Sequence, residues 1–348
     1  MTETTSADVL TTAFSPVTVE QAALIARDFF AIEGTAEPLT SERDQNFRVS
    51  ATSGDAYLLK ISNPAEERTV TNFQTEALRH IALTNPALPV PRVLPAAGGD
   101  FEPLLEQRGE PARVVRLMTY MPGVPLNTVE DVPTKLRSNL GMALARLGAA
   151  LRDFDHPAAD HELMWDLKNT SSLSNLLEYV EEPADQRLAR QFFERFEEYV
   201  RPQLGQLRSQ VVHNDLNFYN VLVEEHHTER VTGIIDFGDM VRTPLICDVA
   251  VAAAYQLPAD DDPLGCALTF IGAYHRTTAL EPMETQLLFD LIATRLLMTV
   301  LITGWRAARY PDNSAYILRN NPAAWRNLRY FARTGHDVGI ERICAVCS

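Results

Sequence analysis

The stretch from Val211 to Asp239, VVHNDLNFYNVLVEEHHTERVTGIIDFGD, decides the fold of this chain. Val221 to Glu224 and Val231 to Ile235 are short apolar runs that predict β-strands. The polar segment between them, Glu225 to Glu229, predicts a turn. Two strands joined by so short a turn pair antiparallel, so the start of the first lies beside the end of the second.

This pairing brings oxygen-bearing side chains together. Asn220 precedes the first strand and Asp236 follows the second, so both are expected at one end of the hairpin. An amide oxygen and a carboxylate are ligands that Mg²⁺ takes, with phosphates and water completing its shell. Asp215, five residues before Asn220, is placed to accept a proton from an attacking hydroxyl or to orient it. His213 either transfers protons or braces the loop, and we favour the bracing role.

Asp and Asn are common in turns, so each of these residues alone indicates little. The joint pattern is more specific: H-x-D-x-x-x-x-N, a strand hairpin, and then I-D-F-G-D. Such a set predicts phosphoryl transfer, in which the protein mainly positions groups and neutralises charge.

Lys60 is a second candidate, because lysine is rare here. The 31 basic residues include only three lysines, and Lys60 stands inside the apolar run Tyr57 to Ile61. Lysine contacts phosphate as a compact point charge that arginine does not replace. The alternative is a lysine at a strand edge that extends its amine to water. Glu76, on a predicted helix over residues 69–83, is expected to pair with Lys60; otherwise it is a surface glutamate.

The layout predicts an α+β fold with two lobes, a small mixed-sheet lobe and a larger, mainly helical one. We expect a flexible N-terminal tail over 1–16, a nucleotide-binding N-lobe over 17–118, a catalytic and acceptor-binding C-lobe over 119–335, and a C-terminal tail over 336–348. Apolar spacing predicts helices over 17–32, 69–83, 134–152 and 184–206, and strands over 46–50, 57–62, 102–107 and 113–119.

Composition excludes several classes of protein. The net charge of -15 disfavours a nucleic-acid or anionic membrane partner. No signal peptide is visible, and the apolar run Leu287 to Thr303 contains Asp290 and Arg295, which predicts a buried helix rather than a membrane span. The four cysteines fit a reducing cytoplasm, and the lone pair Cys344 and Cys347 is weak evidence for zinc or redox chemistry. The oligomeric state stays open.

The chain resembles the aminoglycoside phosphotransferase and choline kinase superfamily, relatives of the protein kinases with the same bilobal fold. The resemblance runs from about residue 17 to residue 330. It is carried by His213, Asp215, Asn220 and Asp236, with Lys60, Glu76 and the hinge Leu117 to Gly123 in the family's order. Within the superfamily the chain is similar to the hydroxylysine kinase-like branch through Ser41 to Phe47, Ile235 to Met240 and Tyr310 to Asn313.

The resemblance implies ATP or GTP as co-substrate and Mg²⁺ as cofactor. It implies that Lys60, steadied by Glu76, contacts the phosphates and that the backbone near Met118 and Tyr120 holds the purine. No G-x-G-x-x-G is present, so the turn with Asp44 and Asn46 would cover the phosphates instead. The remaining implied roles are the catalytic base (Asp215), the magnesium ligands (Asn220 and Asp236) and a brace for the catalytic loop (Asp248).

The catalytic core does not name the acceptor. Candidate contacts are Asp239, Trp165, Asp166 and Arg295: a cationic amine suits the carboxylates or the indole, and a carboxylate suits the arginine. By resemblance we expect a hydroxylated amino acid or amino alcohol, with an aminoglycoside or other antibiotic as runner-up. The absence of an activation segment after Asp236 argues against a protein substrate. Two other classes stay open: a hydrolase with His213, Asp215 and Asp236 as metal ligands, and a non-catalytic nucleotide-binding module.

Overall fold

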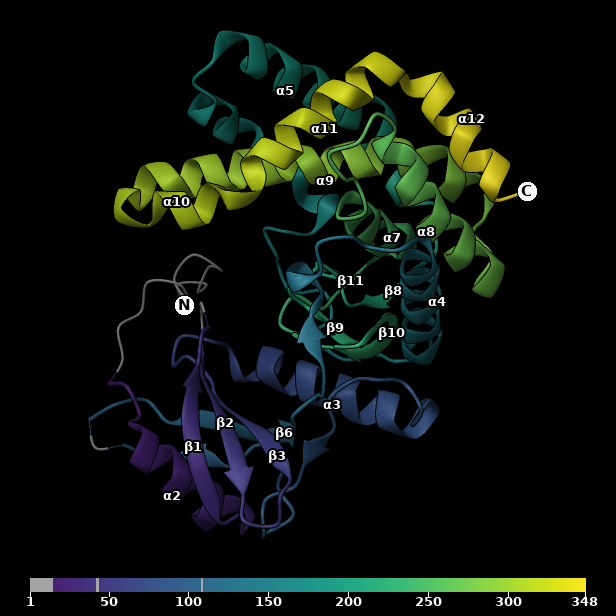
Figure 1. The fold of residues 1–348 in the computed structure, drawn as a ribbon. Helices are drawn as coiled ribbons and strands as arrows, with labels where there is room; N and C mark the ends of the chain where they lie inside the picture. Colours follow the sequence, from purple (N-terminus) through teal and green to yellow (C-terminus); the bar gives the residue numbers. More distant parts are fainter. Residues whose placement is uncertain (1–14, 42–43, 108) are drawn as a thin grey trace. The chain divides into compact units, whose positions relative to one another are not determined.

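The structure is a computed structural model that describes residues 15–41, 44–107 and 109–348 (Figure 1). It forms two compact units. The N-unit comprises 15–123 with the later segments 154–162 and 232–238, and the C-unit comprises 124–153, 163–231 and 239–348. The expected N-terminal tail over 1–16 lies outside the described residues except for its last two.

An antiparallel sheet organises the N-unit. Its strand order is β1 (Gly34–Leu39), β2 (Gln45–Ala51), β3 (Ala56–Ile61), β6 (Arg113–Thr119) and β4 (Val93–Leu94), and β5 (Leu104–Leu105) also pairs with β6. The hairpin of β2 and β3 was predicted, and its turn contains Gly54 at φ 96°, a conformation that favours glycine. The edge strand β1 was not predicted.

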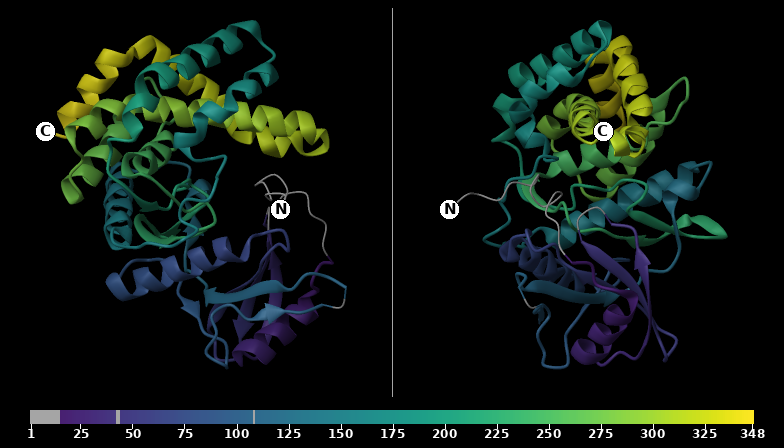
Figure 2. Two further views of the ribbon diagram at one scale, coloured as in Figure 1. Left: turned by 180° about the vertical axis from the view of Figure 1, so that it is seen from behind. Right: turned by 90° about the vertical axis from the view of Figure 1, so that its left-hand side faces the viewer.

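Two helices belong to this sheet. Helix α2 (Val19–Phe30) begins at a capping box formed by Thr18 and Gln21. The helix lies against the sheet (Figure 2). Its apolar face, including Ala22 and Ile25, packs into one core with sheet residues such as Leu59. Helix α3 (Arg68–Thr84) follows β3 and buries the face predicted from its apolar spacing.

The two later segments join the N-unit through specific contacts, which is why the expected bounds of 17–118 are too narrow. The rings of Phe154, His156 and His161 contact the ring of Phe73 on α3. The Ile234 amide donates to the Pro89 carbonyl at 2.8 Å.

The C-unit contains two small sheets. In one, β9 (Val221–Glu224) lies between β7 (Val124–Pro125) and β10 (His227–Ile234), whose residues 232–234 are counted with the N-unit. In the other, β8 (Ser209–Val212) pairs antiparallel with β11 (Val241–Pro244). The β9–β10 hairpin was predicted, but its turn has only two residues. His227 to Glu229 extend β10, because an edge strand tolerates polar side chains that face water.

The rest of the C-unit is helical. Its elements are η1 (Leu126–Thr128), α4 (Thr134–Leu151), η2 (Leu167–Tyr179), α5 (Pro183–Arg195), η3 (Phe196–Val200), α6 (Arg201–Leu204), α7 (Leu245–Ala254), α8 (Pro263–Thr277), α9 (Pro282–Arg309), η4 (Pro311–Asn313), α10 (Ser314–Ile317), η5 (Leu318–Asn320), α11 (Asn321–Thr334) and α12 (His336–Val346). The helix expected over 184–206 is thus interrupted by a π-helical turn, η3.

Helix α9 is the centre of this unit, with α7, α11 and α12 packed along it (Figures 1 and 2). It is long and apolar enough to cross a membrane by length and composition alone, but 89% of its apolar window is buried inside the protein. The expected C-terminal tail over 336–348 is wrong for most of its length, because α12 packs on α9 with Ile343 buried. The chain is therefore α+β.

Candidate active site

The catalytic loop, residues 213–220, connects β8 to β9 in the C-unit and fixes the carboxylate of Asp215. Its Oδ2 accepts hydrogen bonds from Nδ2 of Asn217 at 2.9 Å and from Nδ2 of Asn220 at 2.7 Å. The same Asn220 nitrogen lies 3.0 Å from the Asp215 carbonyl. The expected neighbours Asp215 and Asn220 are thus in direct contact.

His213 and Asp248 support this loop from the protein interior. His213 is fully buried, and its Nδ1 accepts the backbone N–H of Asp215 at 3.3 Å, which is a bracing contact. The Oδ1 of Asp248, on α7, accepts the backbone N–H of Asn214 at 2.8 Å. Burial raises the pKa of Asp248 to about 7, although the backbone N–H groups of Asn214 and His213 work in the opposite direction.

Two residues near the expected site have a left-handed backbone. Asn214 has φ 63° and Asp236 has φ 62°, a region that is sparsely populated by non-glycine residues, although Asn and Asp adopt it more readily than others. The Asn214 side chain is also fully buried, and neither its Oδ1 nor its Nδ2 has a hydrogen-bond partner in the described part of the chain. Strain and unsatisfied polar atoms of this kind cluster at functional sites.

Arg295, from the middle of α9, lies beside the expected catalytic base. Its Nη2 is 3.5 Å from Oδ1 of Asp215 and 3.4 Å from the hydroxyl of Tyr255. The guanidinium also lies over the Trp165 ring, 4.7 Å from its centroid. Burial lowers the pKa of Arg295, but Tyr255, Asp215 and Asp239 together hold it above the ordinary value. The Arg295 cation and the Asp215 carboxylate are therefore neighbours within the C-unit.

The other expected acceptor contacts differ in their surroundings. Trp165 is half-buried under Arg295, and the Asp239 charge acts on the same guanidinium. Asp166 instead is fully buried: its Oδ1 accepts the Thr243 hydroxyl at 2.7 Å, and its Oδ2 lies 3.2 Å from Nζ of Lys168. An acceptor contact for Asp166 is therefore wrong, because the carboxylate is enclosed by its own chain and joins η2 to β11.

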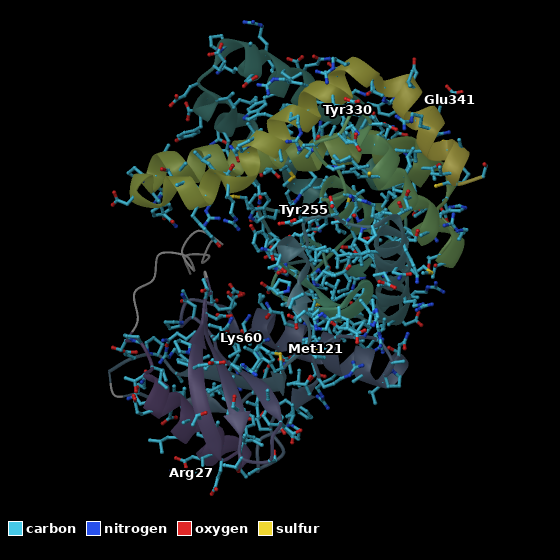
Figure 3. All side chains as sticks on the ribbon, viewed as in Figure 1. Arg27, Lys60, Met121, Tyr255, Tyr330 and Glu341 are labelled. Atoms are coloured by element: carbon cyan, nitrogen blue, oxygen red, sulfur yellow. The ribbon has the colours of Figure 1, made fainter. Side chains whose placement is uncertain are left out.

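Three residues around this place were missed in the sequence. Tyr255 (labelled in Figure 3) follows α7, and burial raises the pKa of its hydroxyl, which stays a hydrogen-bond donor. Arg319 has its guanidinium 5.3 Å from the Tyr219 ring centroid, and Tyr219 is an exposed member of the catalytic loop. Only Tyr219 carried a signal, since it lies inside the H-x-D-x-x-x-x-N pattern.

In the N-unit, Lys60 projects from β3 (Figure 3) into an ion pair with Asp44. Its Nζ is 2.9 Å from Oδ2 of Asp44, and Oδ1 of Asp44 accepts the backbone N–H of Asn63 at 2.9 Å. Burial works against the charge of Asp44, but Lys60 and buried Arg116 hold the pKa of its carboxyl below the ordinary value. Asp44 is thus the residue that orients the Lys60 side chain.

The expected partner of Lys60 is therefore wrong. Glu76 pairs with Arg79 on the same helix, at 2.6 Å, and both side chains are more than one third exposed. Residues three apart on a helix are neighbours on its surface, so this local pair forms readily. The structure therefore supports the alternative, that Glu76 is a surface glutamate.

The remaining nucleotide residues lie along the same sheet. Asn46 is opposite Lys60 in the β2–β3 ladder, and its buried Oδ1 has no hydrogen-bond partner in the described residues. Met118 lies in β6 opposite Leu58. The N–H of Tyr120 donates to the Ala56 carbonyl at 3.1 Å, which removes that donor from the contacts available to a purine. Glu42 and Arg43 belong to the segment Ser41 to Phe47, which resembles the hydroxylysine kinase-like branch, and they lie outside the described residues.

The residues expected to hold Mg²⁺ fit a hard cation by their chemistry. Both hydrogen bonds of the Asn220 amide nitrogen go to Asp215, which leaves the amide oxygen as the acceptor end. Asp236 is exposed, and its Oδ1 accepts a 3.2 Å hydrogen bond from the Gly238 N–H. In the described part of the chain, no group of three or more His, Cys, Asp or Glu side chains could hold a metal ion.

Comparison with known proteins identifies the family of this chain. The sequence pattern of the phosphotransferase enzyme family matches residues 35–285. The chain is 26% identical over 350 residues to hydroxylysine kinase of Mus musculus, which covers 94% of this chain and 93% of that protein. It is 26% identical over 332 residues to hydroxylysine kinase of Xenopus laevis, covering 88% and 86%.

Solved structures show the same fold. An amicoumacin kinase in complex with AMP-PNP, Ca²⁺ and Ami has a TM-score of 0.65 at 18% identity and covers 88% of this chain and 93% of that one. A microcompartment-associated aminopropanol kinase has a TM-score of 0.60 at 16% identity and covers 95% and 99%. The family pattern spans well over half of the 348 residues. The chain therefore belongs to the phosphotransferase enzyme family, and it is a phosphotransferase that acts on an alcohol group.

Proposed function

We propose that this enzyme transfers the terminal phosphate of ATP or GTP to the hydroxyl of a small amine-bearing amino acid or amino alcohol, with hydroxylysine as the first candidate. The observation that carries the proposal is the 3.5 Å approach of the Arg295 guanidinium to the Asp215 carboxylate. Asp215 can then receive the proton of the acceptor's hydroxyl group while Arg295 binds the carboxylate of the same small molecule.

Asp215 is the catalytic base in this proposal. Its Oδ2 is occupied by the amides of Asn217 and Asn220, so the carboxylate is held in one orientation. Its Oδ1, the oxygen beside Arg295, faces the acceptor. Positioning of this kind supplies most of what a phosphoryl transfer needs from the protein.

Arg295 and its neighbours recognise the acceptor. The planar guanidinium over the Trp165 ring is pre-oriented for a carboxylate. Asp239, whose charge also acts on Arg295, receives the ammonium group of the acceptor. An acceptor with both an amine and a carboxylate meets complementary charges at these two residues.

The N-unit supplies the lysine that contacts the nucleotide phosphates. Lys60, oriented by Asp44, contacts the phosphates as a point charge. Asn220 and Asp236 would hold Mg²⁺, which neutralises phosphate charge when bound. The similarity to hydroxylysine kinases over 94% of the chain supports the choice of acceptor, because it includes both ends of this arrangement.

The test is an acceptor screen by nucleotide consumption. Purified enzyme with Mg²⁺ and either ATP or GTP is offered hydroxylysine, homoserine, choline, aminopropanol and several aminoglycosides. We expect the highest kcat/KM with hydroxylysine and a clear preference for acceptors with both amine and carboxylate. Preference for an aminoglycoside would refute the acceptor class, and nucleotide binding without turnover on any acceptor would favour the non-catalytic module.

A further inference from the structure

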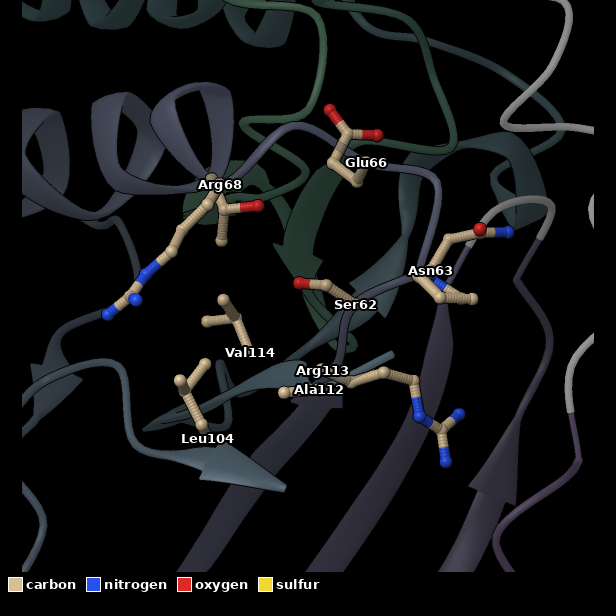
Figure 4. A pocket seen from close by; sticks show the side chains of 10 residues that line it. Ser62, Asn63, Glu66, Arg68, Leu104, Ala112, Arg113 and Val114 are labelled. Atoms are coloured by element: carbon tan, nitrogen blue, oxygen red, sulfur yellow. The ribbon is translucent and has the colours of Figure 1, made fainter. Parts of the chain in front are cut away.

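A cavity of about 210 Å³ lies in the N-unit, and of its lining only Asn63, which binds Asp44, has entered the description of the site above. It is partly open to solvent and is lined by the connection from β3 to α3, by β5 and by the start of β6 (Figure 4). Leu104 and Val114 form an apolar wall, while Ser62, Glu66 and Arg68 bring polar groups to it. A cavity of about 150 Å³ accepts benzene, so this volume suits a molecule of roughly six to eight non-hydrogen atoms.

Ser62 presents an unsatisfied hydroxyl to this cavity. The residue is only 3% exposed, and its Oγ has no hydrogen-bond partner among residues 15–41, 44–107 and 109–348. Its backbone N–H is fixed by the Val114 carbonyl at 2.9 Å, and the hydroxyl points into the cavity toward Arg68 (Figure 4). A buried hydroxyl without a partner destabilises a protein, so its presence indicates a ligand that satisfies it.

Arg68 adds a positive charge on the same side. It is the first residue of the 17-residue helix α3, which has no side-chain cap and no acidic residue in its first turn. The Arg68 guanidinium is exposed and has no ion-pair or hydrogen-bond partner in the described residues. The N-terminal end of a helix carries partial positive charge, which favours an anion there.

We propose that this cavity binds a small carboxylate with a short apolar tail. Arg68 brings one positive charge to the wall and Glu66 one negative charge, whereas the Arg113 guanidinium donates to Gln45 and Gln107, so the wall matches a monoanion better than a dianion. The Ser62 hydroxyl donates to one carboxylate oxygen and Arg68 pairs with the other. The hydrocarbon part packs against Leu104 and Val114.

A hydrogen bond and an ion pair connect this cavity to Lys60, the residue expected to contact the nucleotide phosphates. Asn63, next to Ser62 and also in the cavity wall, donates its N–H to Asp44, which pairs with Lys60. A bound carboxylate that fixes this connection changes the position of Asp44, and hence the KM for the nucleotide. This consequence rests on the proposed function, whereas binding itself does not.

Binding is measured first, by titrating the enzyme without nucleotide with acetate, butyrate and lactate in a thermal-shift assay and by calorimetry. We expect a saturable response to butyrate that Ser62→Ala and Arg68→Gln abolish. The matched control is Arg27→Gln, an exposed arginine of the same unit that pairs with Asp28. It should respond like the unchanged enzyme.

Ser62→Ala gives a second, opposite readout. Because it removes an unsatisfied hydroxyl, we expect the melting temperature without ligand to stay the same or rise slightly, even though ligand binding is lost. No saturable response to any of the three acids overturns the proposal, and so does an equal response in all variants. A KM for nucleotide that butyrate leaves unchanged, with binding intact, would refute the coupling alone and leave the proposed function standing.

Discussion

Lys60 and Asp44 form an ion pair of 2.9 Å in which neither side chain is more than 16% exposed. The pair joins β3 to the residue just before β2, and the N–H of Asn63 fixes the same carboxylate. A lysine paired with a carboxylate that is itself fixed in this way has little conformational entropy left to lose when a phosphate arrives.

The first prediction follows from this pair. Asp44→Asn should lower kcat/KM for the nucleotide about tenfold or more, since losing about 1.4 kcal/mol of positioning gives one factor of ten. Glu76→Gln should stay within about twofold, because Glu76 contacts Arg79 instead. Steady-state kinetics with varied nucleotide measures both. A larger effect from Glu76→Gln than from Asp44→Asn would contradict the assignment.

Asp215→Asn should abolish most of the turnover while leaving nucleotide binding intact. General-base catalysis contributes about 10²- to 10⁴-fold, and the amide keeps the shape but not the basicity of the carboxylate. Single-turnover rates and nucleotide titration measure the two quantities. Asp185→Asn, which breaks a pair with Arg329 on the helical side of the C-unit, is the control with unchanged turnover. Turnover within a few-fold of the unchanged enzyme would exclude Asp215 as the base.

Arg295→Lys separates carboxylate recognition from the chemistry. The variant keeps a positive charge but loses the planar group that lies over Trp165. We expect KM for hydroxylysine to rise about tenfold relative to KM for an amino alcohol without a carboxylate, the size of one lost charged contact. The ratio of the two acceptors is the measurement, because any effect on Asp215 is common to both. An unchanged ratio would show that Arg295 supports the loop and does not bind the acceptor.

The contiguous parts of this site were predictable from the sequence. Asp215 and Asn220 are five residues apart, and the hairpin that follows has an unmistakable alternation of strand, turn and strand. Their proximity could therefore be predicted from the local sequence alone, without knowing the rest of the fold. Helix α9 was likewise predictable as a buried helix, because Asp290 and Arg295 interrupt its apolar run, and the structure pairs Arg295 with Asp215.

The errors concern contacts between distant segments. The partner of Lys60 depends on the turn before β2, and no periodicity says whether Asp44 or Glu76 reaches the amine. Strand β1 was missed because Gly34 to Leu39 has no apolar alternation and contains a proline, which only an edge strand tolerates. Gly34 is required there, since a Cβ would lie 2.1 Å from the Ser50 carbonyl oxygen.

Asp166→Asn tests the corrected role of that residue. The amide can still accept the Thr243 hydroxyl but no longer pairs with Lys168. We expect a loss of about 1–3 kcal/mol in the free energy of unfolding, as for a perturbed buried hydrogen bond, and an unchanged KM for the acceptor. Urea denaturation and acceptor kinetics give the two values. A changed acceptor KM at unchanged stability would restore Asp166 to the acceptor site.

Asp248 predicts how stability depends on pH. Its pKa is about 7 in the folded protein against an ordinary value of 3.8, because the carboxyl is buried. Between these values the folded protein keeps the proton while the unfolded chain loses it, so this group stabilises the fold at low pH and ceases to do so as pH rises through about 7. Asp248→Asn removes the proton exchange, yet its amide oxygen can still accept the N–H of Asn214. We therefore expect the urea midpoint of the unchanged enzyme to fall, relative to that of Asp248→Asn, as pH rises from about 4 to about 7. Parallel curves for the two proteins would mean that Asp248 is ionised in the folded enzyme and that its two backbone hydrogen bonds outweigh its burial.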